Sequence, residues 1–400
     1  MTSKSIDDEE KKLENELFDQ FKDINPNDLI RGKTPDDINE RCFKLVQIYM
    51  TNNDQWKRLC KTTNDLNVRR ITGGMTNQLY YVGLKNGINE IDNDAITIKF
   101  YQSKHFKKDI INGDTDDERL NDTIISIIIS EQGIGPKVFG ILSDGIIQSY
   151  HEHEQFRPKH QHNDRLLKKL AYLLAKLNNL DIPIAKDKFY LIDILTSYIH
   201  EGYRHHDVLS LAKEFNLRYL LENDFLAEMD WFDSFIRYYL DQCPMVFNHN
   251  DFRGNNIMVL KDSDEILLCD FEYSSYGFRG YDLASFLMEW DRNFLNFEDT
   301  SLPSDDVVEK FIQFYIEGWE QIDPGYSTRE ENSCQKIMNE TKIGYLFVLI
   351  HIMGVTLHQK EEIIASLQFD PKKISIGVNF MFKRYLDFKN LLIEEKIIDY

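Results

Sequence analysis

The stretch that decides the fold is CPMVFNHNDFRGNNIMVLKDSDEILLCDFEYSSYGFRGYDLASFLMEW, residues 243–290. MVFNH predicts a strand that runs into a polar loop, NNIMVL a second strand, KDSD a turn and EILLCDF a third strand. These strands bring together Asp251 in the loop, Asn256 at its far side and Asp270 at the end of the last strand. Burying two carboxylates and an amide together is costly unless a cation or a substrate satisfies them.

The spacing of these groups is typical of phosphoryl transfer, because it runs His-x-Asp, then Asn, then Asp-Phe. Magnesium prefers oxygen ligands and is usually held by one or two carboxylates together with substrate phosphates. A carboxylate beside the metal can accept the proton of an attacking hydroxyl. The pattern therefore predicts a magnesium-dependent phosphotransferase. The alternative is a pair of hairpin loops whose Asp and Asn residues only form turns, and the whole constellation disfavours it.

The same stretch resembles the choline/ethanolamine kinase family, whose members have a protein kinase-like fold. The motifs that carry the resemblance are HND, the NI pair, DFEYSSY, RGYDL and the closing EW, and weaker echoes run from about Val68 to the C-terminal helices. The resemblance implies an α+β, two-lobed fold with a small β-rich N-terminal lobe and a larger helical C-terminal lobe. It also implies ATP and Mg²⁺ as cofactors, and Asp251 as the catalytic aspartate, braced by His249. Asn256 and Asp270 correspond to the metal ligands, and Asp282 supports the catalytic loop.

A second group of residues upstream is expected to contact the nucleotide. GGMTN lies between two predicted strands, and its glycines let the backbone approach a phosphate, although a plain hairpin turn is the alternative. AITIKFYQ predicts a strand on which Lys99 points away from Ile98. The resemblance makes Asp122 the acidic partner of Lys99, and residues 148–150 the hinge whose backbone reads adenine. The nucleotide residues expected in this way are Gly73, Gly74, Thr76, Asn77, Lys99, Asp122, Gln148 and Tyr150.

The substrate side departs from the family. The residues expected there are Glu272, Glu289, Arg253 and Phe294. Arg253 stands where choline kinases often carry glutamine, and a fixed cation does not favour an ammonium substrate. The family's C-terminal helix usually supplies two tryptophans, but here Val348 and His351 occupy that register; a core-facing helix is the alternative interpretation. Because aromatic faces recognise a quaternary ammonium, ethanolamine is predicted to be preferred over choline.

The predicted function is ATP-dependent phosphorylation of a small amino alcohol, which the resemblance assigns to the first step of phosphatidylethanolamine and phosphatidylcholine synthesis. Two alternatives remain at this point. One is a kinase of the same fold that acts on another small hydroxylated metabolite. The other is a non-catalytic relative that serves as a binding protein.

Charge and composition exclude several other classes. The 47 Lys and Arg against 67 Asp and Glu give a net charge of −20, which argues against nucleic acid and anionic membranes as partners. The five cysteines are scattered and suit a reducing, cytoplasmic compartment. The most apolar segment, Tyr345–Leu357, is too short at 13 residues to span a bilayer, so no membrane insertion is expected. The sequence leaves a homodimer open.

The chain is expected to have three parts. Residues 1–38 form an acidic N-terminal extension, residues 39–155 a nucleotide-binding lobe, and residues 156–400 a catalytic and substrate-binding lobe. Residues 37–60 have helical spacing, and strands are expected on both sides of the Asp144-Gly145 turn.

Overall fold

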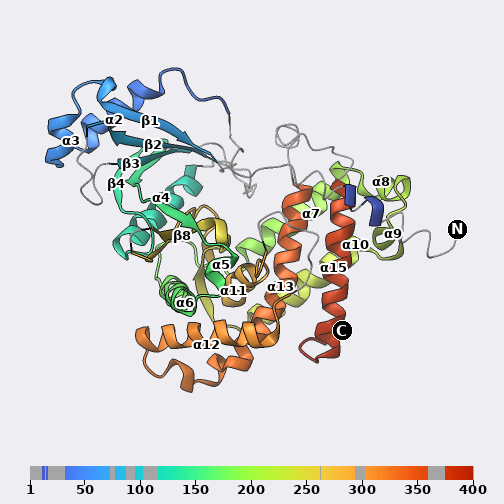
Figure 1. The fold of residues 1–400 in the computed structure, drawn as a ribbon. Helices are drawn as coiled ribbons and strands as arrows, with labels where there is room; N and C mark the ends of the chain where they lie inside the picture. Colours follow the sequence, from blue (N-terminus) through green and yellow to red (C-terminus); the bar gives the residue numbers. More distant parts are fainter. Residues whose placement is uncertain are drawn as a thin grey trace. The chain divides into compact units, whose positions relative to one another are not determined.

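The computed structural model describes residues 11–13, 15–16, 32–72, 77–86, 95–101, 116–261, 263–292, 302–358 and 374–399, with only the backbone of residues 116–118. The chain forms two compact units, and Figure 1 labels most of their helices and several of their strands. The N-terminal unit comprises residues 24–155 and 256–272, and the C-terminal unit comprises residues 1–23, 156–255 and 273–400. The division of roles between lobes at residue 155 stays a prediction.

The N-terminal unit is built on a five-stranded antiparallel sheet in the order β1-β2-β3-β5-β4. The strands are β1 (Leu66–Ile71), β2 (Gln78–Leu84), β3 (Ala95–Phe100), β4 (Val138–Leu142) and β5 (Gly145–Ser149). In β3 burial alternates as the sequence predicts, with Ile96 and Ile98 buried and Lys99 on the opposite face. Gly145 begins β5 because no side chain fits there: a Cβ would lie 2.1 Å from the Lys99 carbonyl oxygen.

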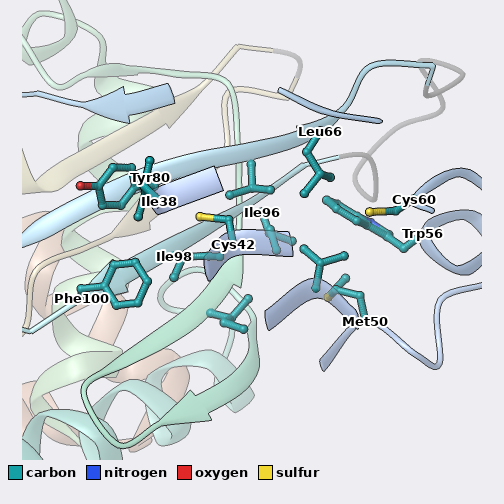
Figure 2. Close-up of a cluster of buried hydrophobic side chains, with 13 residues drawn as sticks. Ile38, Cys42, Met50, Trp56, Cys60, Leu66, Tyr80, Ile96, Ile98 and Phe100 are labelled. Carbon is teal, nitrogen blue, oxygen red and sulfur yellow. The ribbon is translucent and has the colours of Figure 1, made fainter. Parts of the chain in front are cut away.

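Two helices, α2 (Ile38–Tyr49) and α3 (Asp54–Leu59), complete the hydrophobic core of this unit. Figure 2 shows Cys42 of α2, Trp56 of α3 and Ile98 of β3 within one cluster of buried side chains. Removal of this apolar surface from water stabilises the unit. The core therefore fixes the sheet that carries Lys99.

The helical run expected over residues 37–60 is interrupted. The Asn53 side chain accepts hydrogen bonds from the backbone N–H groups of Gln55 (3.0 Å) and Trp56 (3.3 Å), so it caps α3 and separates it from α2. Asn is among the preferred N-cap residues because its side-chain oxygen satisfies N–H groups that lack a partner within the helix. The expectation of one continuous helix is wrong at this point.

The N-terminal unit also contains one long helix and a second sheet. These elements are α4 (Asp116–Glu131) and the strands β6 (His153–Gln155), β8 (Ile257–Leu260) and β9 (Ile266–Leu268), in the order β6-β8-β9. β8 and β9 are the predicted hairpin, whereas β6 was not predicted. The Leu268 N–H donates to the Ile134 carbonyl at 2.8 Å, which ties the hairpin to the turn after α4.

The C-terminal unit is mostly helical. Its elements are α5 (Pro158–Gln161), α6 (Asp164–Asn178), α7 (Tyr190–His205), α8 (Val208–Glu214), α9 (Arg218–Glu222), α10 (Phe225–Leu240), β7 (Met245–Asn248), β10 (Ser275–Phe278), α11 (Arg279–Leu287), α12 (Asp305–Ile322), α13 (Cys334–Leu357) and α15 (Ile374–Glu394). β7 and β10 pair antiparallel, so the chain before Asn248 and the chain after Ser275 lie side by side.

A buried ion pair and two glycines join α11 to α13. Gly280 and Gly344 lie at the crossing, where a Cβ on Gly344 would come within 2.3 Å of the Gly280 carbonyl oxygen. Arg279 Nη2 donates to Glu340 Oε1 at 2.9 Å, and both side chains are fully buried. Breaking such a pair is strongly destabilising because it leaves one buried charge without its partner. The contact therefore holds the start of α11, which leads to Asp282, against α13.

Helix α13 is longer than the apolar segment recognised in the sequence. At 24 residues it is long and apolar enough to cross a membrane by length and composition alone, so the argument from a 13-residue segment is wrong. However, 72% of its apolar window is buried inside the protein. Figure 1 shows α13 and α15 running side by side in the C-terminal unit. Burial, rather than length, makes α13 a core helix.

Candidate active site

The loop that follows β7, residues 249–255, is held by the buried carboxylate of Asp282. The backbone N–H groups of His249 and Asn250 donate to its two oxygens at 2.7 and 2.9 Å. Asn250 has a positive φ of 61°, and its side chain donates to the Tyr273 carbonyl and the Ser275 hydroxyl, both at 2.8 Å. Asn tolerates this backbone region better than most residues. The loop is thus fixed directly before Asp251.

Burial raises the pKa of Asp282 to about 7, although the two backbone N–H groups act in the opposite direction. The carboxylate is fully buried, and it supports the loop as the sequence predicted. It is the buried anchor of residues 249–250, because its two oxygens accept from consecutive backbone N–H groups.

Asp251 forms an ion pair within its own loop. Arg253 Nε lies 2.8 Å from Asp251 Oδ1, and both side chains are partly buried. The Asp251 N–H donates to Nδ1 of the fully buried His249 at 3.3 Å. Arg253, which the sequence marked as a departure from the family, therefore pairs with the aspartate expected to be catalytic.

Glu289 closes the other side of this loop. Its Oε2 accepts the Gly254 N–H at 3.1 Å. Gly254 has no room for a side chain, since a Cβ would lie 2.4 Å from the Phe156 carbonyl oxygen. Burial raises the pKa of Glu289, and Arg253 opposes that rise. The Arg253 guanidinium therefore interacts electrostatically with both Asp251 and Glu289.

An uncharged pair from two helices lies near these charges. The Tyr281 hydroxyl of α11 is hydrogen-bonded to His351 Nδ1 of α13. Desolvation lowers the pKa of His351 to about 4, with Asp251 opposing and Arg253 reinforcing the shift. His351 is therefore neutral near pH 7. Tyr281 was not recognised from the sequence, although it lies inside the RGYDL motif.

In the N-terminal unit, Lys99 and Asp270 form an ion pair at 2.8 Å. Desolvation lowers the pKa of Lys99, but Asp270 and Glu272 raise it above its ordinary value, so the ammonium stays charged. Lys99, Asp270 and Glu272 line one pocket of the N-terminal unit. The complete wall of this pocket consists of Lys99, Tyr101, Asp122, Ser126, Ile129, Pro136, Ile146, Gln148, Cys269, Asp270, Phe271 and Glu272. The predicted nucleotide residues Lys99, Asp122 and Gln148 thus share one pocket.

Asn256 and Asp270 lie at the same end of the β8–β9 hairpin. The Cys269 N–H donates to the Asn256 carbonyl at 3.0 Å, and Asp270 follows directly with a positive φ of 66°. An amide oxygen and a carboxylate are suitable ligands for Mg²⁺, which usually completes its shell with phosphates and water. No cluster of three or more His, Cys, Asp or Glu suited to a metal occurs among the described residues. The donor set fits a nucleotide-bound metal better than a cage made of protein alone.

A second cation, Arg119 of α4, lies in this unit. It pairs with Asp122 at 2.9 Å and approaches Glu272 at 3.7 Å. The Asn77 amide donates to the same Glu272 oxygen at 3.3 Å. The sequence placed Asp122 opposite Lys99 and Glu272 on the substrate side. In the structure both carboxylates contact Arg119, which the sequence analysis did not single out despite its position three residues before Asp122. The predicted roles of Asp122 and Glu272 stay predictions.

Of the remaining predicted site residues, the structure describes Tyr150 but not the glycine loop or Phe294. Tyr150 is not in the wall of the nucleotide pocket, and its ring lies edge-on to Tyr81 with centroids 4.7 Å apart. Its backbone N–H donates to the Ala95 carbonyl at 3.3 Å. Gly73, Gly74, Thr76 and Phe294 lie outside the described residues.

This fold, with a carboxylate loop and a lysine–aspartate pocket, defines a phosphotransferase of the protein kinase-like class. The family profile of choline/ethanolamine kinase matches residues 68–382, and the chain belongs to that family. Family membership confirms the predicted enzyme class and the use of ATP.

Two relatives illustrate the range of the likeness in sequence. The chain is 23% identical over 303 residues to a human choline/ethanolamine kinase, covering 70% of this chain and 69% of the relative. It is 26% identical over 253 residues to a probable ethanolamine kinase of Arabidopsis thaliana, covering 62% and 63% of the two chains.

Two solved structures share the fold. The choline kinase of Cryptosporidium parvum has a TM-score of 0.62 at 19% identity, covering 89% of this chain and 97% of its own. The ethanolamine kinase of Plasmodium vivax has a TM-score of 0.61 at 18% identity, covering 92% and 91%. These likenesses confirm the predicted α+β kinase-like fold.

Proposed function

We propose that this enzyme transfers the γ-phosphoryl group of ATP to the hydroxyl of ethanolamine in preference to choline. The observation that carries the proposal is the uncharged Tyr281–His351 pair near Asp251. His351 belongs to the helix on which the family usually places two tryptophans, so polar groups stand where an aromatic enclosure is expected.

The chemistry of the two amines explains the preference. A quaternary ammonium has no N–H donors, and each aromatic face that recognises it contributes roughly 0.5–2 kcal/mol. A primary ammonium donates three hydrogen bonds. Glu289 offers it a carboxylate, and His351 and Tyr281 offer neutral nitrogen and oxygen acceptors. The polar set therefore penalises choline more than ethanolamine.

The residues of the C-terminal unit supply the acceptor side of the reaction. Asp251 orients the substrate hydroxyl and accepts its proton as the oxygen attacks phosphorus. Arg253 fixes the Asp251 side chain through the ion pair. His249 and Asp282 position the loop rather than take part in proton transfer, because both are fully buried.

The residues of the N-terminal unit supply the nucleotide side. Lys99 binds the phosphates, and Asn77 contributes a side-chain amide beside them. Asn256 and Asp270 would hold Mg²⁺, which neutralises charge on the phosphate oxygens when it is bound. We place Glu272 on this side as well, because its contacts with Asn77 and Arg119 belong to the N-terminal unit.

A second candidate is a kinase of the same fold that acts on another small hydroxylated metabolite. The Arg253 guanidinium beside Asp251 favours it, since a fixed cation suits a substrate with acceptor oxygens.

All five cysteines are free, which supports a cytoplasmic enzyme. A homodimer remains a prediction.

Steady-state kinetics tests the proposal. Ethanolamine should have a kcat/KM higher than that of choline by about 5–150-fold, corresponding to ~1–3 kcal/mol. The variant His351→Trp should shift the ratio toward choline, whereas His351→Gln, which keeps a polar side chain, should retain the preference for ethanolamine. A higher kcat/KM for choline in the wild-type enzyme would refute the preference. Kinetics with a panel of other small alcohols tests the second candidate, which predicts a higher kcat/KM for one of them than for ethanolamine.

A further inference from the structure

The nucleotide pocket of the N-terminal unit contains a buried carboxylate, Glu272, whose charge has to be balanced. Its side chain is only 2% exposed, and it lies in the same pocket wall as Lys99 and Asp270. A buried carboxylate is costly unless donors and cations satisfy it. An unbalanced charge on Glu272 would also repel the phosphates of a nucleotide and attract the Lys99 ammonium.

Arg119 of α4 supplies a positive charge beside Glu272. Its Nη1 lies 3.7 Å from Glu272 Oε2 and 2.9 Å from Asp122 Oδ2. The guanidinium carbon lies 4.9 Å from the centroid of the Tyr101 ring, which is also part of the pocket wall. A planar guanidinium can contact two carboxylates and an aromatic face at once. These contacts hold the charge of Arg119 in place next to Glu272.

The chain directly before β2 is attached to the same carboxylate oxygen. The buried Asn77 amide donates to Glu272 Oε2 at 3.3 Å. Asn77 is the last residue of the GGMTN motif, which is expected to contact the phosphates. Glu272 therefore connects the end of this motif to α4, and the orientation of the Asn77 amide depends on it.

Lys99 is sensitive to both carboxylates of the pocket wall. It forms an ion pair with Asp270 at 2.8 Å. Desolvation lowers the pKa of Lys99, whereas the charges of Asp270 and Glu272 raise it, so both carboxylates act on the ammonium. Lys99 is the only cation among the described residues that line this pocket. Loss of Arg119 would therefore draw Lys99 towards Glu272 and away from Asp270.

We infer that Arg119 is a positioning residue of the nucleotide site. It acts through Glu272: by balancing the charge of this carboxylate, it leaves Lys99 to the nucleotide phosphates and keeps Glu272 as the acceptor for Asn77. The inference rests on the proposed function in one respect, namely that Lys99 binds the phosphates. It does not depend on the choice between ethanolamine and choline, and it gives Glu272 a role on the nucleotide side.

The test measures nucleotide binding and the two KM values in the full chain. Calorimetric titration with ADP and Mg²⁺ uses no amino alcohol, so it tests the inference even if the preference for ethanolamine is wrong. Arg119→Gln should weaken ADP and raise the KM for ATP by about 5–30-fold, as expected for one lost charge-assisted contact. The KM for ethanolamine should change by less than ~2-fold. An ADP affinity like that of the wild type, even with a lower melting temperature, would make Arg119 a purely structural residue and overturn the inference.

A second substitution shows whether Arg119 acts through Glu272. Glu272→Gln removes the charge that attracts Lys99 but keeps an amide oxygen as acceptor for Asn77. The double variant Arg119→Gln/Glu272→Gln should therefore bind ADP more tightly than Arg119→Gln, a recovery that two independent effects would not give. ADP binding by the double variant that is equal to or weaker than that of Arg119→Gln would overturn the inference.

Two further variants complete the comparison. Arg119→Lys keeps the charge without the planar geometry, and it should weaken ADP less than Arg119→Gln does. Arg41→Gln is the matched control, because it breaks an exposed ion pair with Asp144 (3.1 Å) in the same unit. Its ADP affinity should equal that of the wild type. A loss of ADP binding in Arg41→Gln as large as in Arg119→Gln would show that any broken ion pair in this unit has the same effect, and would contradict the specific role of Arg119.

Discussion

The nucleotide pocket of the N-terminal unit and the catalytic loop of the C-terminal unit handle charge in different ways. In the pocket, each cation has its own carboxylate: Lys99 pairs with Asp270, and Arg119 pairs with Asp122. In the loop, Asp251 pairs with Arg253, whose charge also acts on Glu289. The neighbours of the loop, Tyr281 and His351, are uncharged near pH 7. In the pocket, each cation is thus matched by one carboxylate. In the loop, two carboxylates, Asp251 and Glu289, lie near the single cation Arg253, which favours the binding of a cationic substrate.

The largest expected effect comes from Asp251→Asn. Removing the proposed proton acceptor should lower kcat by at least ~10²-fold, since general-base catalysis contributes about 10²–10⁴-fold. The melting temperature should change little, because Glu289 remains near Arg253. Rapid-quench or coupled-assay kinetics and thermal melts measure both quantities. Asp230→Asn, which alters an exposed ion pair with His200, is the control. A variant that keeps half its turnover would remove Asp251 from the mechanism.

Asp270→Ala in the pocket should lower both activity and stability, whereas Asp251→Asn in the loop should lower activity alone. The substitution leaves the partly buried Lys99 ammonium without its closest carboxylate, and we expect a loss of about 1–3 kcal/mol. Urea unfolding and a magnesium titration of activity test the two effects. Glu265→Ala, an exposed position on the same hairpin, is the control. Turnover and nucleotide binding like those of the wild type at saturating magnesium would contradict the metal assignment.

The neutral state of His351 predicts a pH dependence of stability. Its pKa is about 4 in the folded protein and 6.5 as the reference value, so between these pH values the unfolded state binds more protons. The contribution of His351 to the free energy of unfolding should therefore fall by about 1–2 kcal/mol as the pH falls from 7 to 5. Burial raises the pKa of Asp282 and gives an opposite contribution in the same range, so the effect of His351 is read as a difference between proteins. Relative to the wild type, His351→Gln should be more stable at pH 5 than at pH 7 by about that amount in urea unfolding. His205→Gln, at an exposed position, should keep the wild-type slope. Equal slopes for His351→Gln and the wild type would show that His351 is not held neutral.

The smallest effect concerns the N-terminal extension, which lies outside both regions compared here. Removing residues 1–31 should leave an active enzyme. Removing residues 1–36 should cost about 1 kcal/mol more, because Arg70 then loses hydrogen bonds to the Gly32 carbonyl (2.7 Å) and the Thr34 hydroxyl (3.2 Å). Unfolding curves and kcat of the two truncated chains make the comparison. An inactive shorter truncation would show that the extension completes the site.

Local patterns carried much of the prediction. Alternation of apolar residues placed Lys99 on the open face of its strand, and the hairpin spacing placed Asn256 and Asp270 at one end of β8–β9. These features depend on residues that are near each other in sequence or in adjacent strands. The break between α2 and α3 was missed, although Asn53 before Asp54 is a typical N-cap.

Contacts between distant elements could not be read in the same way. The pairing of Arg119 with Asp122 is a local i,i+3 contact on α4, but the approach of Arg119 to Glu272 needs the packing of α4 against the hairpin end. The Tyr281–His351 bond joins helices 70 positions apart, and it depends on the close crossing that Gly280 and Gly344 permit. The periodicity of apolar residues in a single sequence does not predict which two helices cross at such close range.

The apolar helix α13 has a consequence for synthesis of the chain. Its neighbours in the C-terminal unit include α7 and α11, which precede it, and α15, which follows it. A growing chain therefore presents a 24-residue apolar segment before the last covering helix has left the ribosome. During that interval the segment is exposed to self-association or to chaperones. Recovery of soluble protein should consequently depend on translation through residues 374–394 more than on any residue that touches the substrates.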